Sequence, residues 1–160
     1  MPRFTVIQVG ADRLDSTLPL VRMAAPLTSA RQWRCYVDAL STSGGGLLAA
    51  FARDERPHGI AAYRIEDDLA QGRTLRVEPM VTFEINRSGP ARAALCEALE
   101  RIARAQGCVC LKIATGSRGF ADPQGTKAEA WAPLGFELGS VSLVKRLAPL
   151  DRLIASQNLG

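Results

Sequence analysis

The alternation of apolar and polar residues predicts several strands in the first half of the chain. Residues 4–9 are β-branched and aromatic, and residues 47–53 and 59–66 are apolar runs on either side of a short polar turn. These two runs are expected to pair as a hairpin. Residues 73–85 alternate with the period of two that strands show. Pro79 interrupts this stretch, and because proline cannot donate to a ladder, a bulge or a splayed edge is expected there.

Helical spacing marks the region between the first strand and the hairpin. Residues 16–41 are expected to be mainly helical, with breaks at Pro19 and Pro26. Ser29 suits the N-terminal cap of a helix. The larger side chains of that helix share one face, namely Trp33, Tyr36, Val37 and Leu40. The glycine-rich residues 41–46 that follow are expected to form a turn.

The clearest helix begins at Pro90, since proline fits the first helical position, where no amide hydrogen is needed. Apolar residues recur at helical spacing as far as Ile102, and Gly107 stands where a left-handed C-cap is expected. Residues 108–114 follow as a predicted buried strand. A strand, a helix and another strand in this order predict a parallel pair joined by a crossover.

The remaining residues predict a short helix over 126–134, one or two strands over 136–147 and a short helix over 149–158. Together these elements predict a mixed α+β fold. The length of 160 residues is typical of one domain, and no stretch is long enough to be a linker. Residues 1–160 are therefore expected to form a single domain.

Composition argues against several classes of protein. No apolar run reaches the roughly 18–20 residues of a membrane span, and the N-terminus lacks the features of a signal peptide. We therefore expect a cytoplasmic protein with no membrane partner. The net charge is +4, but the basic residues are scattered, which does not favour nucleic-acid binding. A polyanionic small ligand, such as a cofactor that carries a nucleotide, fits this charge equally well.

Metal chemistry finds little support in the residues that could carry it. Cys108 and Cys110 are separated by one residue rather than by the two of a zinc or redox pair. The other candidate ligands, Cys35, Cys96 and His58, show no ligand spacing either. The cysteines are expected to be buried or half-buried thiols, and no metal site is expected.

The turn over residues 86–92 follows the long predicted strand and begins the clearest helix. A helix N-terminus presents unpaired amides and a partial positive charge, which suit a phosphate. Gly89 lets the backbone approach a ligand, Ser88 adds a hydroxyl, and Arg87 or Arg92 adds a cation. The turn has neither the pattern of a P-loop nor that of a dinucleotide fingerprint. An ordinary capped helix start explains the same residue types, so on chemistry alone both interpretations stay open.

The motif Asn86-x-x-Gly89-x-Ala91 resembles the Gln/Arg-x-x-Gly-x-Gly/Ala motif of the GNAT acyltransferase superfamily. In that superfamily the backbone amides of the loop bind the pyrophosphate of acetyl-CoA. Val81 is similar to the apolar residue at the strand bulge, where backbone groups meet the thioester and the pantetheine arm. The run from Ala130 to Phe136 looks like the helix that ends in Tyr-x-x-x-Gly-Phe. The resemblance spans roughly residues 59–147, in the family's order of elements.

The resemblance implies a central mixed, mostly antiparallel sheet with a parallel β-α-β cofactor-binding unit and helices on both faces. It implies acetyl-CoA as the acyl donor and an amine as acceptor. Dimers are common in the superfamily, so a homodimer is one oligomeric state that the resemblance allows, and the sequence leaves the choice open. The implied cofactor-binding residues are Val81, Thr82, Phe83, Asn86, Arg87, Ser88, Gly89, Pro90, Ala91, Arg92, Gln124 and Trp131.

Three residues depart from the family pattern. Asn86 stands where Gln or Arg is usual, and Pro90 removes one amide from the loop. Trp131 replaces the tyrosine that often protonates the leaving thiolate, and an indole N–H is a donor only. Water or another side chain would then have to supply that proton.

The implied activity is transfer of acetyl from acetyl-CoA to an amine by direct attack, which requires a proton acceptor near the amine. Glu78 and Glu84 on the long predicted strand are the candidate catalytic carboxylates. His58 titrates in a suitable range, but it lies in the predicted hairpin turn. The alternative function, motivated by Trp131 and Pro90, is a non-catalytic acyl-CoA sensor on the same fold.

Overall fold

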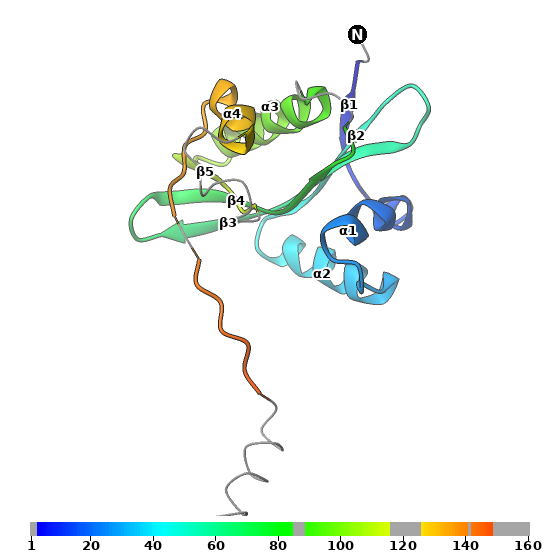
Figure 1. Cartoon of the computed structure of the whole chain (residues 1–160), viewed down its shortest axis with the longest axis horizontal. Helices are drawn as coiled ribbons and strands as arrows, with labels where there is room; N and C mark the ends of the chain where they lie inside the picture. The colour runs from blue at the N-terminus through cyan, green and yellow to red at the C-terminus, as the bar shows by residue number, and fades with distance from the viewer. Residues whose placement is uncertain (1–2, 85–88, 116–125, 141, 149–160) are drawn as a thin grey trace, which may run out of the picture.

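The computed structural model describes residues 3–84, 89–115, 126–140 and 142–148. At its centre is a sheet of five strands in the order β1-β2-β3-β4-β5 (Figure 1). The strands are β1 (Thr5–Gln8), β2 (Gly46–Phe51), β3 (Pro57–Asp68), β4 (Gly72–Thr82) and β5 (Cys110–Ile113). Each strand is antiparallel to its neighbour except β4 and β5, which are parallel. The predicted hairpin and the predicted parallel crossover are both confirmed.

Helices cover both faces of this sheet, as the resemblance implied (Figure 1). On one side lie η1 (Leu14–Thr17), α1 (Leu18–Ala24) and α2 (Ala30–Thr42), and on the other lie α3 (Pro90–Ala105), α4 (Thr126–Trp131) and η2 (Ala132–Leu134). None of the helices in the described ranges is long and apolar enough to cross a membrane. The mixed α+β fold class is thereby confirmed.

Strand alternation divides the buried side chains into two cores, one on each face of the sheet. Ile60 and Ala62 of β3 belong to the core beneath α1 and α2, together with Trp33. Ala61 and Tyr63, the residues between and after them, belong to the core beneath α3. Because successive strand side chains point to opposite faces, β3 contributes to both hydrophobic layers at once.

The helix signals in the sequence act as expected. Ser29 accepts a hydrogen bond from the Gln32 amide at 3.1 Å, and the Gln32 side chain accepts one from the Ser29 amide at 2.8 Å. This capping box satisfies two amides at the start of α2. At the end of α3, Gly107 adopts φ +70° and the Cys108 amide donates to the Ala103 carbonyl at 2.8 Å. That geometry closes the helix with a left-handed glycine.

The bulge expected at Pro79 is present. Ala61 pairs with Met80 and Tyr63 pairs with Val77, so Glu78 and Pro79 together oppose the single residue Ala62. Lys112 joins β5 to the end of β3, because its ammonium donates to the carboxylate of Asp68, the last residue of β3. This hydrogen bond and those from the turn amides lower the pKa of Asp68 to about 2.

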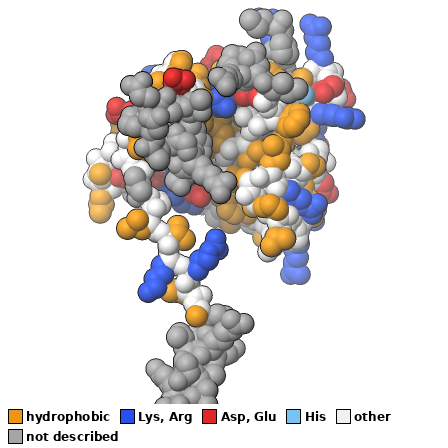
Figure 2. Space-filling model, viewed as in Figure 1, with side chains coloured by type: hydrophobic (Ala, Val, Ile, Leu, Met, Phe, Trp, Pro, Cys, Tyr) orange, Lys and Arg blue, Asp and Glu red, His pale blue; other side chains and the backbone are white. Residues whose placement is uncertain are grey.

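Two expectations about the last third of the chain are wrong. Residues 136–140 and 142–148 contain no strand. Figure 2 shows that the last described segment extends away from the rest of the molecule with its apolar and basic side chains exposed. Its apolar residues Leu143, Val144 and Leu147 are more than four-fifths exposed. An alternating sequence becomes a strand only where a hydrogen-bonding edge is available to it. The predicted buried strand 108–114 is also shorter and half-buried, because β5 is an edge strand.

Candidate functional site

The end of β4 has an edge that β5 does not cover. The parallel ladder ends where Val77 pairs with Ile113, and the Ala114 amide donates to the Val77 carbonyl at 2.9 Å. β4 continues from there to Thr82, paired with β3 alone among the described residues. The two strands therefore part at the bulge, which leaves backbone groups of β4 without a neighbour on that side.

The hydrogen bonds of β3 identify which groups face this open edge. The Phe83 amide donates to the His58 carbonyl at 2.7 Å. Bonded residues alternate along an antiparallel pair, so Val81 also bonds to β3, whereas Met80 and Thr82 turn their N–H and C=O groups away from it. Val81 is 9% exposed and packs into the core beneath α1 and α2. Phe83, by contrast, is 57% exposed at the end of the strand.

The first turn of α3 lies close to the end of β4, and its amides are already occupied. Pro90 has no amide hydrogen. The amides of Ala91 and Arg92 both donate to Oε1 of Glu84, the latter at 3.3 Å. The Ala93 amide donates to the Gly89 carbonyl at 2.9 Å. A carboxylate at a helix N-terminus is stabilised by the helix dipole, and here the anionic group on these amides is the Glu84 side chain of the chain itself.

Gly89 makes the turn into α3 possible. Its φ is +54°, in the left-handed region that glycine enters without strain. A Cβ placed on it would lie 2.9 Å from both Nη1 of Arg92 and Oε2 of Glu84. The Arg92 guanidinium in turn lies 5.3 Å from the centroid of the Trp131 ring. A cation over an aromatic face is attractive, so this contact ties the end of α4 to the start of α3.

We expect Gly89→Ala to destabilise the protein more than Gly107→Ala does. Both glycines have positive φ, which costs an alanine about 1–2 kcal/mol. A Cβ at Gly107 meets nothing within 4 Å, whereas at Gly89 it meets Glu84 and Arg92. Because both obstacles are the ends of flexible side chains, we expect about 1 kcal/mol of extra cost. Urea unfolding of the two variants measures the difference, and equal losses would show that the neighbours of Gly89 yield freely.

Glu78 lies at the bulge and faces α2 rather than α3. Its carboxylate accepts from Nη2 of Arg76 at 3.2 Å, and its side chain is 51% exposed. Its carbonyl accepts a hydrogen bond from the Tyr36 hydroxyl. Burial, followed by the charge of Glu78, raises the pKa of Tyr36, so this phenol stays protonated at neutral pH. Arg76 also lies 3.9 Å from Oε1 of Glu66, which extends the charged cluster onto β3.

The structure therefore brings part of the predicted site together and separates the rest. Around the first turn of α3 it gathers Glu84, Gly89, Pro90, Ala91, Arg92 and Trp131. Val81, Thr82 and Phe83 lie at the adjoining end of β4, while Glu78 belongs to the other face of the sheet. Asn86, Arg87, Ser88 and Gln124 lie outside the described residues.

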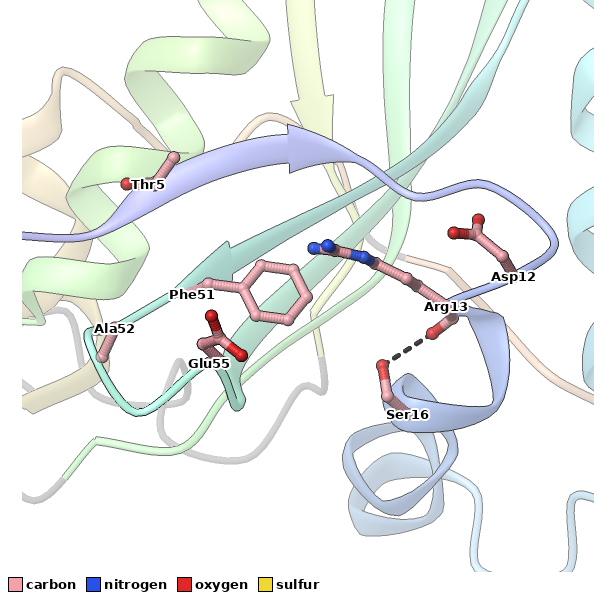
Figure 3. Close-up of a pocket in the computed structure, with 7 residues that line it drawn as sticks. All are labelled: Thr5, Asp12, Arg13, Ser16, Phe51, Ala52 and Glu55. Carbon is pink, nitrogen blue, oxygen red and sulfur yellow. Dashed lines mark hydrogen bonds between the residues drawn. The ribbon is translucent and has the colours of Figure 1, made fainter.

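One hollow in the described surface lies away from these residues (Figure 3). It has a volume of about 420 Å³ and lies beside β1, the edge strand opposite β5. The Arg13 guanidinium reaches over the Phe51 ring there, 5.8 Å from its centroid, with the carboxylates of Asp12 and Glu55 nearby. None of the predicted site residues lines it.

A second groove of about 330 Å³ lies between α3 and η2 and is lined in part by Cys96. Burial raises the pKa of this thiol to about 11. The thiol is therefore protonated at neutral pH and is not an activated nucleophile. Within the described ranges, no three His, Cys, Asp or Glu side chains gather as metal ligands would.

Two contacts at the site were not anticipated from the sequence. The Tyr36 hydroxyl reaches the Glu78 carbonyl across 42 positions, and Arg92 reaches Trp131 from another helix. Tyr36 was expected only as part of the apolar face of its helix, yet it is 38% exposed. Its position at the edge of that face, one turn from the buried Trp33 and Leu40, is the only signal that the sequence offers.

Several solved structures are similar to this chain. The aminoglycoside N-acetyltransferase AAC(6')-Iy in complex with CoA gives a TM-score of 0.74 at 16% identity, over 92% of this chain and 96% of that one. An acetyltransferase of Trypanosoma brucei gives 0.69 at 19% identity, over 91% and 100%. AAC(6')-Ih of Acinetobacter baumannii gives 0.72 at 14% identity, over 92% and 100%. No protein-family model matches the sequence, and no curated protein does either. What is shared at these identities is the fold, and this chain has the GNAT acetyltransferase fold.

Proposed function

We propose that this protein is an N-acetyltransferase that moves an acetyl group from acetyl-CoA to an amine by direct attack. The observation that carries the proposal is the open edge of β4 beside the N-terminus of α3, within a fold shared with acetyltransferases. One of the similar structures holds CoA, and another holds a bisubstrate analogue in which CoA is joined to acetylneamine. No metal is part of the proposal.

The residues at this edge fit the donor in two places. The pantetheine arm contains two amides, and the outward N–H and C=O groups of Met80 and Thr82 offer these amides the pairing that a neighbouring strand would. The diphosphate suits the first turn of α3, where the amides of Ala91 and Arg92, which donate to the Glu84 carboxylate, form a cradle for an anion. Arg92 adds a positive charge, which Trp131 holds beside that turn.

The hydrogen bonds and the exposure of the two carboxylates favour Glu78 over Glu84 as the general base. The attacking amine must be neutral, and the proton that it loses on acylation needs an acceptor. Glu84 already accepts two amide hydrogen bonds at α3, whereas Glu78 is half-exposed at the bulge, where the thioester is expected. In this scheme the neutral amine attacks the thioester carbonyl, Glu78 takes the proton, and the thiolate leaves as CoA and gains a proton from water.

The acceptor would then approach from the face that carries α1 and α2. This face presents Glu78 beside the Arg76 guanidinium, with the Tyr36 hydroxyl fixed on the carbonyl of the same glutamate. The carboxylates of Glu66 and Glu78 flank Arg76, so the surface offers both signs of charge to an amine that carries other polar groups. The bisubstrate analogue bound by AAC(6')-Iy joins CoA to acetylneamine.

Isothermal titration tests the donor half of the proposal directly. We expect acetyl-CoA to bind with a Kd of roughly micromolar order, equivalent to about 8 kcal/mol of binding free energy. Release of free CoA thiol during incubation with a panel of aminoglycosides, polyamines, amino acids and peptides then tests transfer. Absence of binding by protein that circular dichroism shows to be folded would reject the proposal.

A further inference from the structure

We propose that Glu84 is a built-in competitor of the cofactor's diphosphate, held on the amides that the diphosphate needs. This inference rests on the proposed function, because it concerns the same end of α3. It goes beyond that function in assigning Glu84 a role in setting cofactor affinity rather than in the chemistry of transfer.

The hydrogen bonds at α3 are the first reason. In the first turn, Pro90 has no N–H and the Ala93 amide is bonded to the Gly89 carbonyl at 2.9 Å. The only other amides there, those of Ala91 and Arg92, both donate to Glu84 Oε1. A diphosphate can therefore reach these two amides only after the carboxylate has left them.

The second oxygen of the same carboxylate is the other reason. Oε2 of Glu84 is buried and has no hydrogen-bond partner among the described residues. The guanidinium of Arg92 does not pair with it and lies over the Trp131 ring instead. A buried acceptor without a partner costs free energy. Burial of Oε2 therefore destabilises this conformation of Glu84, whereas the two hydrogen bonds to Oε1 stabilise it. The side chain as a whole is partly exposed.

Competition follows from the charges. The carboxylate and the diphosphate are both anions, and the same two N–H groups cannot serve both at full strength. If the carboxylate stayed beside the bound diphosphate, the two groups would also repel each other. Binding of CoA thus includes the release of Glu84 into water, where its unpaired oxygen becomes solvated. The measured affinity is the intrinsic affinity reduced by the cost of that release.

The test compares Glu84→Gln with wild type by calorimetric titration of CoA. The glutamine side chain keeps its shape but loses the charge that strengthens the amide hydrogen bonds, so we expect CoA to bind about tenfold more tightly. Thermal unfolding without ligand is expected to show a lower Tm for the variant, because a helix-capping carboxylate is lost. Tighter binding by a less stable protein is a combination that a purely structural cap does not produce.

Two controls separate this effect from general electrostatics. Glu100→Gln removes the same charge from an exposed position of α3 and is expected to leave the affinity for CoA within about twofold of wild type. Pantetheine carries the arm without the diphosphate, so its affinity is expected to be equal in Glu84→Gln and in wild type.

Backbone amide resonances of Ala91 and Arg92 are expected to shift in the unliganded variant and again on addition of CoA.

The outcomes are distinct. If wild type binds CoA and Glu84→Gln binds equally or more weakly, Glu84 organises the turn and the competition is overturned, while the proposed function stands. If only the variant binds, the competition is supported in its strongest form. If neither folded protein binds CoA, the proposed function fails and this inference fails with it.

Discussion

Glu78→Gln is expected to lower kcat for acetyl transfer by about 10²- to 10⁴-fold, the range that a positioned general base contributes. Glutamine preserves the size of the side chain but cannot accept the proton from the amine. The Tyr36 hydrogen bond to the carbonyl of residue 78 involves the backbone, so the bulge is expected to stay in place. Binding of acetyl-CoA is therefore expected to be unchanged, and only the rate of transfer falls.

Glu66→Gln is the matched control for this experiment. Glu66 lies on the neighbouring strand, contacts the same Arg76, and belongs to the same proposed acceptor surface. It loses the same charge but is expected to alter KM more than kcat. The pH profile gives a second measurement, since the rate of Glu78→Gln is expected to rise with pH as more of the amine is already neutral. An unchanged kcat over the whole pH range would exclude Glu78 as the base.

Trp33→Ala is expected to lower the free energy of unfolding by about 3–5 kcal/mol, the cost of removing a large buried aromatic side chain. Trp33 is 3% exposed in the core beneath α1 and α2. Its indole Nε1 donates to Thr17 Oγ1 at 2.9 Å, and its ring stacks on Tyr36 with centroids 5.7 Å apart. A domain of this kind has only about 5–15 kcal/mol of stability, so the variant is expected to be close to unfolded at moderate temperature.

Trp33→Phe separates the hydrogen bond from the packing. Phenylalanine keeps most of the buried volume, and Thr17 Oγ1 still donates to the Leu14 carbonyl at 2.6 Å. We therefore expect a smaller loss of about 1–2 kcal/mol, the size of a buried hydrogen bond. Urea unfolding measures both variants. A loss below about 1 kcal/mol for Trp33→Ala, as for a surface substitution, would contradict the packing that the structure shows.

Local physical rules explain how much of the fold the sequence could predict. The hairpin of β2 and β3 follows from two apolar runs around a polar turn, and the bulge at Pro79 follows from the missing amide of proline. The bounds of α2 and α3 follow from Ser29, Pro90 and Gly107, each of which has a conformational or hydrogen-bonding preference of its own. Predictions of this kind held because the cause and the effect lie within a few residues of each other.

The predictions that failed concern features that depend on distant parts of the chain. Residues 136–147 alternate as a strand would, but whether a strand forms depends on an edge that another part of the molecule must supply. The half-burial of β5 likewise depends on its place at the end of the sheet. The local sequence pattern does not determine the order of strands in a sheet or the neighbours of an edge strand. Both result from packing between segments that are far apart in the chain.

The same division applies to the candidate site. Gly89 in the predicted turn 86–92, the proline at the first position of α3 and the pair of glutamates on the predicted strand 73–85 were all evident from the sequence. Only the tertiary structure decided that Glu78 and Glu84 serve different places, one beside Tyr36 and Arg76 and the other on the amides of α3. The reason is that β4 ends at Thr82, so Glu84 lies beyond the strand, where the unpaired amides and dipole of a helix start attract its carboxylate.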